Sequence, residues 1–258
     1  MLFPNIDPII FSIGPLSVRW YGLMYLLGFV FAYLVISRLA SRRGLQLGKD
    51  DLSDLLFYAV IGVVLGGRIG YTLFYNAGHF LSHPVEIFYV WEGGMSFHGG
   101  LLGVVCALLL FCHRRQFSPL LVGDLAVTAA PFGLGFGRLG NFINGELWGR
   151  VTDVPWAVIF PAAGLEPRHP SQLYEAFLEG PVLFCFLWYL HRSGAKAGVP
   201  FFSFFILYGF FRFMVEFVRQ PDAHLGFLWA GATMGQLLSL PMILFGIVGL
   251  FYLKKRAS

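Results

Sequence analysis

Seven long apolar stretches dominate this chain and limit what it can fold into. A helix that crosses the hydrocarbon core of a bilayer needs about 20 mostly apolar residues. Helices and closed barrels alone satisfy the backbone in that medium. The stretches therefore predict an all-α membrane protein with about seven transmembrane helices, the third of which we expect to extend beyond its apolar limits. The stretches run near 17–37, 53–75, 98–112, 120–137, 171–190, 200–218 and 233–253.

The composition agrees with a membrane protein. Hydrophobic residues make up 57% of the chain and charged residues only 12%, with a mean hydropathy of +0.70, whereas a soluble domain has about 25% charged residues. No internal repeat is visible, which weighs against the common transporter architectures. We predict one polytopic domain over 1–258, with an interfacial arm at 1–16, an outer arm loop at 76–97 and an outer signature and head region at 138–170. The arm lacks the Lys or Arg of a cleavable signal peptide.

The positions of Lys and Arg predict the orientation. Cytoplasmic loops are enriched in both residues, and eleven of them follow the first, third, fifth and seventh stretches. All eleven fall on one side if the N-terminus is outside and the C-terminus is cytoplasmic. They are Arg38, Arg42, Arg43, Lys49, Arg114, Arg115, Arg192, Lys196, Lys254, Lys255 and Arg256.

The seven remaining basic residues are all arginines, and three of them lie in or at the end of apolar stretches. Arg68 and Arg212 lie inside such stretches, and Arg138 closes another, while Arg19 and Arg150 suit ordinary outer-surface positions. An arginine at the bilayer centre costs at least about 2.5–3.5 kcal/mol, so it usually marks a function or an obligatory pair. At 1.5 Å per residue, Arg68 lies roughly 22 Å and Arg212 roughly 18 Å from the cytoplasmic side. This depth suits an anionic lipid headgroup in the outer leaflet.

The longest island of polar residues and glycines is GRLGNFINGELWG at 137–149. Its Asn and Gly residues suit a turn whose backbone N–H groups face a ligand. Arg138 and Asn141 are three residues apart, so both point one way if the helix continues. The alternative is a plain re-entrant turn, which leaves an arginine, two asparagines and a glutamate at the bilayer edge unexplained.

A second island, GGMSFHGG at 93–100, contains His98. A histidine at this position suits a general base, because its usual pKa lies near the working pH. The alternative is a capping or structural histidine. No G-x-S-x-G elbow accompanies it, so a serine hydrolase is not indicated.

The stretch at 200–218 contributes charged and phenolic side chains at helical spacing. Tyr208, Arg212, Glu216 and Arg219 are four, four and three apart, which places them on one helical face. Mutual neutralisation of Arg212 and Glu216 is the alternative to a ligand role. The preceding stretch, at 171–190, has Gln172, Glu175 and Glu179 at spacings of three and four near its outer end, and we favour a hydrogen-bonded network between helices there. Tyr21 opens the first stretch, where an interfacial aromatic residue is expected in any case.

Other chemistries lack support in the sequence. The histidines at 79, 83, 113, 169, 191 and 224 show no pair at metal-ligand spacing, and HExxH is absent, so we predict no metal and no cofactor. Cys106, Cys112 and Cys185 lie in apolar runs and suit packing. No basic patch interleaves with aromatic residues, so we expect no nucleic acid.

At these motifs the chain resembles the prolipoprotein diacylglyceryl transferase family. The resemblance rests on GRLGNFINGELWG at 137–149 and on five further motifs in family order. These are WYGLMY at 20–25, GGRIGY at 66–71, GGMSFHGGL at 93–101, RHPSQLYE at 168–175 and YGFFRFMVEFVRQPD at 208–222. Together they span nearly the whole chain.

The resemblance implies a reaction and a place for it. Phosphatidylglycerol would donate its diacylglyceryl group to the lipobox cysteine of a preprolipoprotein signal peptide, leaving a thioether and glycerol 1-phosphate. The protein would lie in the bacterial inner membrane with its active site toward the outer, periplasmic leaflet. The catalytic set would be His98, Arg138, Arg212, Tyr21 and Tyr208. The phosphatidylglycerol-binding set would be Arg138, Arg212, Asn141, Asn144, Glu146, Gly149, Arg68 and Glu216.

Two other classes of protein remain open at this point. An anion or lipid transporter also uses intramembrane arginines, but it predicts charges in both halves of the bilayer and usually a repeat. A non-catalytic assembly protein of the membrane does not need a histidine and three arginines aimed at one depth.

Overall fold

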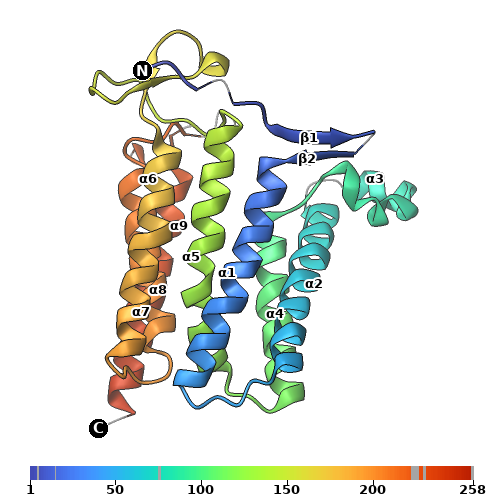
Figure 1. The fold of residues 1–258 in the computed structure, drawn as a ribbon, viewed down its shortest axis with the longest axis vertical. Helices are drawn as coiled ribbons and strands as arrows, with labels where there is room; N and C mark the ends of the chain where they lie inside the picture. The colour runs from blue at the N-terminus through green and yellow to red at the C-terminus, as the bar shows by residue number, and fades with distance from the viewer. Residues whose placement is uncertain (5, 15, 75–76, 222–226, 229–230, 257–258) are drawn as a thin grey trace. The chain divides into compact units, whose positions relative to one another are not determined.

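The structure is a computed structural model, and its parts fall into two compact units. It describes residues 1–4, 6–14, 16–74, 77–221, 227–228 and 231–256 (Figure 1). Unit 1 comprises Met1–Leu39 and Gly123–Ser258, and unit 2 comprises Ala40–Val122. The prediction of one polytopic domain stays a prediction.

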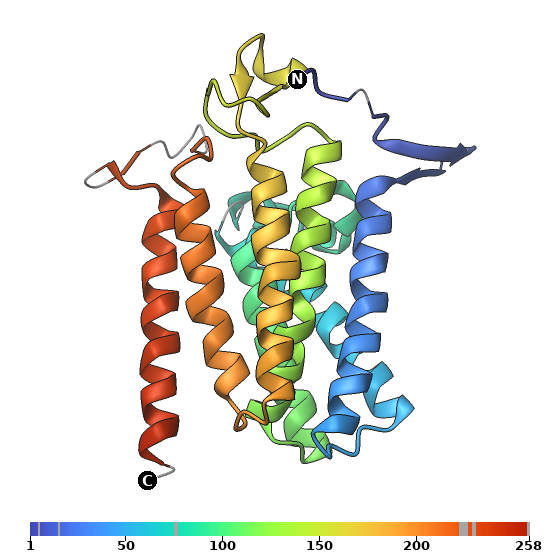
Figure 2. The same cartoon turned by 60° about the vertical axis from the view of Figure 1, so that its left-hand side comes forward.

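Unit 1 contains long helices whose axes are roughly aligned in both ribbon views, with successive helices running in opposite directions (Figures 1 and 2). The chain leaves unit 1 within α1, after Leu39, and returns to it within α5, at Gly123. The N- and C-terminal ends lie at opposite ends of these helices. The helices are α1 (Trp20–Arg42), α5 (Pro119–Ile143), α6 (Ser171–Phe177), η4 (Leu178–Val182), α7 (Leu183–Arg192), α8 (Val199–Val215) and α9 (Met234–Lys255).

Unit 2 is built on the close packing of α2 (Lys49–Phe74) against α4 (Phe97–Arg115). Glycines line the contact on both helices: a Cβ on Gly103 would lie 2.0 Å from the Gly62 carbonyl oxygen, and one on Gly66 would lie 2.3 Å from that of Gly99. Small residues permit this approach between membrane helices. Three short helices connect the pair, namely α3 (Ala77–Ser82), η1 (Pro84–Phe88) and η2 (Val90–Glu92).

Among the described residues, five helical segments are long and apolar enough to cross a membrane: α1, α2, α5, Ser171–Arg192 and α9. The apolar helix α8 is shorter, with 17 residues. Large apolar side chains such as Phe57 and Leu244 are exposed on these helices, as lipid-facing residues are. The mainly helical membrane fold is therefore confirmed. The count of seven crossings and the outside N-terminus stay predictions.

The N-terminal arm corrects the first predicted helix boundary. Residues Ile9–Ile13 (β1) and Leu16–Arg19 (β2) form an antiparallel hairpin with Phe11 opposite Val18. The helix expected from residue 17 therefore begins at Trp20, because the backbone of 17–19 is already paired with β1. A second small sheet pairs β3 (Val158–Ile159) with β4 (Pro167–Arg168), and η3 (Pro161–Ala163) lies between them.

Two other helix ends differ from the sequence limits. The helix predicted to end at residue 137 continues to Ile143, because no chain-breaking conformation occurs before Gly145, where φ is +65°. The helix predicted to reach 218 ends at Val215. Beyond it, the Val218 carbonyl oxygen accepts from the Arg150 N–H at 2.8 Å, so the backbone has left the helix to pair with another segment. The third apolar stretch extends to Phe97–Arg115, as expected.

Candidate functional site

Six buried or half-buried charged residues of unit 1 form one cluster. The arginine–glutamate cluster consists of Arg138, Arg212 and Arg219 with Glu175, Glu179 and Glu216. The side chains of Glu175 and Glu179 are 0% exposed and that of Glu216 is 2% exposed, whereas Arg138 keeps 20% of its side chain exposed. Three positive charges face three negative charges when all six are ionised. Burial on this scale requires such pairing.

Glu175 is the hub of the cluster. It lies on α6 and contacts α5 through Arg138 Nε at 3.1 Å from its Oε2, and it pairs with Arg212 of α8 through its Oε1. Its neighbour Glu179 lies 3.6 Å from the same Arg138 Nε. This confirms the predicted network between helices at Glu175. The sequence signal for the place of Glu175 and Glu179 in this cluster is their spacing of four within an apolar run.

A break in helix geometry accompanies the glutamates. Glu179 lies in η4, a π-helical turn, and the next residue, Gly180, has φ −92° and ψ −106° ahead of Pro181. Gly180 packs against Gly135 of α5, where a Cβ would lie 3.4 Å from the Gly135 Cα. Such π-turns inside α-helices occur frequently at functional sites. The regular helix predicted over 171–190 is therefore interrupted at Gly180.

Arg212 and Glu216 form an ion pair with each other. This is the mutual neutralisation that the sequence analysis gave as the alternative to a ligand role. Arg212 uses both terminal nitrogens, Nη1 toward Glu175 and Nη2 toward Glu216. Glu216 also accepts from Arg219 Nη1 at 3.1 Å and from the Thr233 hydroxyl at 2.6 Å. The helix ends before Glu216, so Arg219 reaches this carboxylate from a turn and not from the predicted helical face.

The residue Tyr208 belongs to the surroundings of this cluster. It lies on α8 within electrostatic range of Glu179 and Arg138, and its ring stacks on that of Phe204 with centroids 5.6 Å apart. Its position places a phenol beside the buried charges, and its catalytic role stays a prediction.

The polar end of α5 forms a second group next to the first. Glu146 Oε1 accepts hydrogen bonds from the side-chain amides of Asn141 at 2.9 Å and Asn144 at 3.2 Å. The helix does continue past Arg138, so Arg138 and Asn141 share a face as predicted. Tyr21 lies against Gly140 and within electrostatic range of both Glu146 and Arg138. The structure therefore brings Tyr21, Arg138, the two asparagines and Glu146 together.

Gly149 is required by close backbone contact. It forms an isolated antiparallel bridge with Arg219, and its N–H donates to the His169 carbonyl oxygen at 2.9 Å. A Cβ there would lie 2.6 Å from the carbonyl oxygens of both His169 and Val218. Arg150, taken above as an ordinary outer-surface charge, instead donates to the carbonyl oxygens of Glu216 and Arg219. That expectation is corrected: Arg150 holds the turn that carries two members of the cluster.

Two predicted site residues belong to unit 2. His98 is exposed in the first turn of α4, which Ser96 caps by accepting from the Gly99 N–H at 3.2 Å. Arg68 is buried and donates to the backbone carbonyl oxygens of Glu86, Ile87, Gly93 and Gly94. The placement of either residue beside the arginine–glutamate cluster stays a prediction, and the contacts of Arg68 favour a role in holding the segment 77–96.

The statement that no histidine pair has metal-ligand spacing is wrong. His79 and His83 are four residues apart, and with Glu86 their ligand atoms all lie within 4.8 Å of one another. The pair does not form an HExxH motif, because its carboxylate comes from η1 and not from between the histidines.

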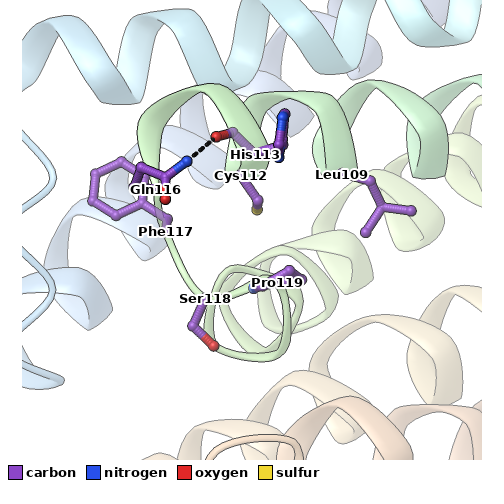
Figure 3. A pocket seen from close by; sticks show the side chains of 7 residues that line it. All are labelled: Leu109, Cys112, His113, Gln116, Phe117, Ser118 and Pro119. Atoms are coloured by element: carbon purple, nitrogen blue, oxygen red, sulfur yellow. Dashed lines mark hydrogen bonds between the residues drawn. The ribbon is translucent and has the colours of Figure 1, made fainter.

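A pocket of about 490 Å³ also lies in unit 2, at the end of α4 (Figure 3). The side-chain amide of Gln116 donates to the His113 carbonyl oxygen at 2.7 Å there. No arginine or carboxylate is among the residues that line it. The lining residues are Leu109, Cys112, His113, Gln116, Phe117, Ser118 and Pro119.

Comparisons with known proteins agree with these features. Residues 8–252 match the family described as prolipoprotein diacylglyceryl transferase. Proteins named phosphatidylglycerol–prolipoprotein diacylglyceryl transferase are similar over nearly their whole length. That of Geobacter sulfurreducens is 59% identical, covering 96% of this chain and 95% of the relative. The proteins of Aeromonas hydrophila (54% identical; 99% and 93% covered) and Bordetella avium (55%; 99% and 97%) are similar to the same extent.

This chain belongs to the prolipoprotein diacylglyceryl transferase family. It is an enzyme, a membrane-embedded transferase of lipoprotein biogenesis. The family predicted from the motifs is thereby confirmed.

Proposed function

We propose that this enzyme transfers the diacylglyceryl group of phosphatidylglycerol to the lipobox cysteine of preprolipoproteins, the first step of bacterial lipoprotein maturation. The observation that carries the proposal is the arginine–glutamate cluster, in a chain whose relatives are named for this activity. The cluster places guanidinium groups, which bind phosphate through paired N–H donors, among helices that cross a membrane.

The chemical step requires charge to move onto phosphate. The thiolate attacks the glycerol carbon that carries the phosphate, a C–S bond forms, and the C–O bond breaks with its electron pair remaining on the phosphate oxygen. Glycerol 1-phosphate leaves as a monoester with one more negative charge than the diester. A base removes the thiol proton, because the thiolate is the nucleophile and a free thiol has a pKa of about 8.5. Positive groups near the phosphate therefore lower the barrier.

Arg138 is the best placed of the arginines for direct phosphate contact. Its ion pairs engage Nε, and its side chain is the most exposed in the cluster. Its terminal nitrogens would then face the phosphate. Arg212 has both terminal nitrogens on carboxylates, so in this proposal it turns toward the phosphate as charge gathers there, while Glu216 keeps it in position.

The remaining predicted residues take supporting roles. Asn141, Asn144 and Glu146 would bind the glycerol headgroup through the amide–carboxylate arrangement at the end of α5. Gly149 fixes the backbone beside Arg219. Tyr21 and Tyr208 supply phenols at two edges of the cluster.

His98 remains our proposed general base. Its exposed position at the start of α4 suits access to a thiol. A base typically contributes about 10²–10⁴-fold to the rate. His98→Gln should therefore greatly reduce turnover in folded protein, and a near-normal rate across pH 6–9 would assign the base elsewhere while leaving the phosphate proposal intact.

The donor experiment tests the function itself. Purified enzyme in detergent is given a lipobox peptide with either phosphatidylglycerol or zwitterionic phosphatidylethanolamine, and both the modified peptide and released glycerol 1-phosphate are measured. We expect transfer from phosphatidylglycerol only. A peptide whose lipobox cysteine is replaced by serine serves as the acceptor control. Equal transfer from both lipids refutes the proposal.

We further propose that the enzyme lies in the bacterial inner membrane with its N-terminus outside and its active site toward the outer leaflet. The grouped basic residues support this orientation. Single cysteines at Ser41 and Ser258, in a background without the three native cysteines, should resist impermeant thiol reagents in intact spheroplasts. Labelling of both overturns the orientation.

A further inference from the structure

Two histidines and a glutamate of unit 2 lie together outside the cluster that carries the proposed reaction. His79 lies in α3, Glu86 in η1, and His83 lies between these helices. Their imidazole and carboxylate ligand atoms are all within 4.8 Å of one another, and both histidines are exposed. None of the three has a part in the transfer reaction as proposed above.

We infer that His79, His83 and Glu86 form a binding site for a divalent transition-metal ion such as Zn²⁺. Two imidazoles and one carboxylate make up the protein ligands of several three-ligand zinc sites, with water completing the tetrahedron. The backbone fixes the order of the ligands: the His83 N–H donates to the His79 carbonyl oxygen at 2.9 Å, and the Glu86 N–H donates to that of His83 at 3.1 Å.

The hydrogen bonds of the side chains suit ligation. His83 Nδ1 lies 3.3 Å from the His79 carbonyl oxygen, so a proton on Nδ1 leaves the Nε2 lone pair available to a metal. Metal-binding histidines commonly donate their other N–H to a carbonyl oxygen in this manner. His79 Nε2 and Glu86 Oε2 lie 2.6 Å apart. A metal ion between them would replace the hydrogen that they share.

The three side chains must rotate slightly before all of their ligand atoms can bind one metal ion. Bond lengths of about 2.0–2.1 Å place tetrahedral ligand atoms roughly 3.3 Å apart, which is less than the 4.8 Å limit of this group. The side chains of His79 and Glu86 are 42% and 35% exposed, so a rotation about their χ angles meets little packing. The rings of His79 and His83 are stacked, with centroids 4.8 Å apart. Because each nitrogen lone pair lies in the plane of its ring, one of the two rings also turns when both bind one metal ion.

Arg68 holds in place the backbone that carries these ligands. Its Nη2 donates to the Glu86 carbonyl oxygen at 2.5 Å and its Nε to that of Ile87 at 2.8 Å. Its guanidinium also lies over the ring of Phe80, the residue after His79, at 5.1 Å from the centroid. A buried arginine thus fixes both α3 and η1, so the ligands converge from a supported backbone and not from a free loop.

The ligand types select the class of metal. Imidazole suits Zn²⁺, Cu²⁺ and Ni²⁺, whereas Mg²⁺ and Ca²⁺ prefer sites made of oxygen ligands. The competing interpretation is a simple His79–Glu86 hydrogen bond that belongs to no metal site. Binding of a metal therefore separates the two interpretations directly.

The experiment uses metal-stripped full-length enzyme in detergent, without a polyhistidine tag. Calorimetric titration with Zn²⁺ should give one site per chain, and a large excess of Mg²⁺ should not compete. His79→Gln and His83→Gln should each weaken binding by about tenfold or more. His113→Gln, which changes an exposed histidine of α4, is the matched control and should bind as wild type does. An unchanged affinity in the His79→Gln, His83→Gln double variant overturns the proposal.

A second measurement uses wild-type protein, so it tests the metal site even if a histidine variant fails to fold. Cu²⁺ bound in place of Zn²⁺ reports the number of coordinating imidazoles through its nitrogen couplings in pulsed electron paramagnetic resonance. We expect two, and none or one overturns the proposal. Because both measurements need no lipid or peptide, failure here leaves the transferase proposal untouched, and failure of the transfer assay leaves this site untouched.

Discussion

Arg68 and Arg138 both lie in apolar helices, but the protein surrounds them with different partners. Arg68, in unit 2, donates to four backbone carbonyl oxygens of the segment that follows its own helix. Arg138, in unit 1, faces the carboxylates of Glu175 and Glu179. The carbonyl oxygens accept hydrogen bonds from Arg68 but are neutral, so they do not neutralise its positive charge. The carboxylates of Glu175 and Glu179 do neutralise the charge of Arg138.

The difference separates an arginine that positions backbone from one that can exchange partners. The carbonyl oxygens around Arg68 belong to a folded backbone, so replacing them would unfold the segment. The carboxylates around Arg138 and Arg212 are side chains, and a phosphate presents the same kind of oxygen to the same donors. In the function that we propose, the cluster admits the phosphate by redistributing its ion pairs, so we expect mutations in the two regions to act on different properties.

The largest effect is expected from removal of the hub of the cluster. Glu175→Ala leaves Arg138 and Arg212 without their shared carboxylate in a buried position. Loss of one partner of a buried ion pair costs about 3–5 kcal/mol, so the free energy of unfolding should fall by about that amount. Denaturation in detergent, followed by the loss of helical circular dichroism, measures it.

Glu166→Ala is the control for that substitution. Glu166 is 67% exposed and lies 3.8 Å from Arg168, whose side chain is 14% exposed. A carboxylate this open to solvent contributes about 0–1 kcal/mol through its ion pair. Similar stabilities for the two variants would mean that the cluster does not behave as a buried network.

The next largest effect concerns the arginines themselves and is read in the rate of transfer. Lysine keeps the charge but lacks the planar fork. If Arg138 and Arg212 grip the phosphate, Arg138→Lys and Arg212→Lys each lose a charge-assisted hydrogen bond worth about 1.5–3 kcal/mol, or roughly tenfold to a hundredfold in rate. Initial rates at matched amounts of folded protein test this.

Arg192→Lys is the comparison for these variants. Arg192 is exposed at the last residue of α7 in the same unit, so its rate should match wild type. Arg150 is unsuitable for the purpose because it donates to backbone carbonyl oxygens behind the cluster. Wild-type rates for both Arg138→Lys and Arg212→Lys would end the phosphate-clamp proposal.

Apolar length and helical spacing allowed much of this arrangement to be predicted from the sequence. The long stretches correspond to helices because a twenty-residue apolar run has few other stable conformations in a membrane. The shared face of Arg138 and Asn141 follows from three-residue spacing on one helix. The network at Glu175 was likewise predicted, since a carboxylate inside an apolar run needs a partner.

Features that depend on distant segments could not be predicted in this way. The end of α8 at Val215 is set by pairing of the following turn with Gly149 and Arg150, which are far away in the sequence. The hairpin that delays the first helix to Trp20 depends on the register of Val18 with Phe11. The kink at Gly180 depends on its approach to Gly135. Spacing within one segment carries no signal for contacts of this kind.

A smaller effect is expected for the positioning arginine of unit 2. Arg68→Lys keeps a charge but cannot reach carbonyl oxygens in three directions at once. The segment 77–96 should open more easily, by about 1.5 kcal/mol, the lower end for a hydrogen bond to a charged group. Hydrogen exchange of the backbone amides in 77–96 measures this opening. Unchanged exchange there, together with a loss of transfer as large as that of Arg138→Lys, would place Arg68 with the phosphate-binding arginines instead.

The smallest effect concerns His169, whose carbonyl oxygen holds Gly149 beside the cluster. Burial lowers the pKa of His169 below its ordinary value of 6.5. The unfolded chain therefore binds more protons than the folded chain between the two pKa values, and stability rises with pH there. The contribution is complete above the unfolded pKa and is lost as pH falls from about 6.5 through the folded pKa.

His169→Gln should remove this part of the dependence of stability on pH. Thermal midpoints of wild type and His169→Gln, compared at steps from pH 8 to pH 5, should differ increasingly toward low pH, with wild type losing more. The difference between the two proteins cancels the other titrating groups. A constant difference across that range would show that this histidine stays uncharged or equally charged in both states, and that unit 1 depends on its backbone contact alone.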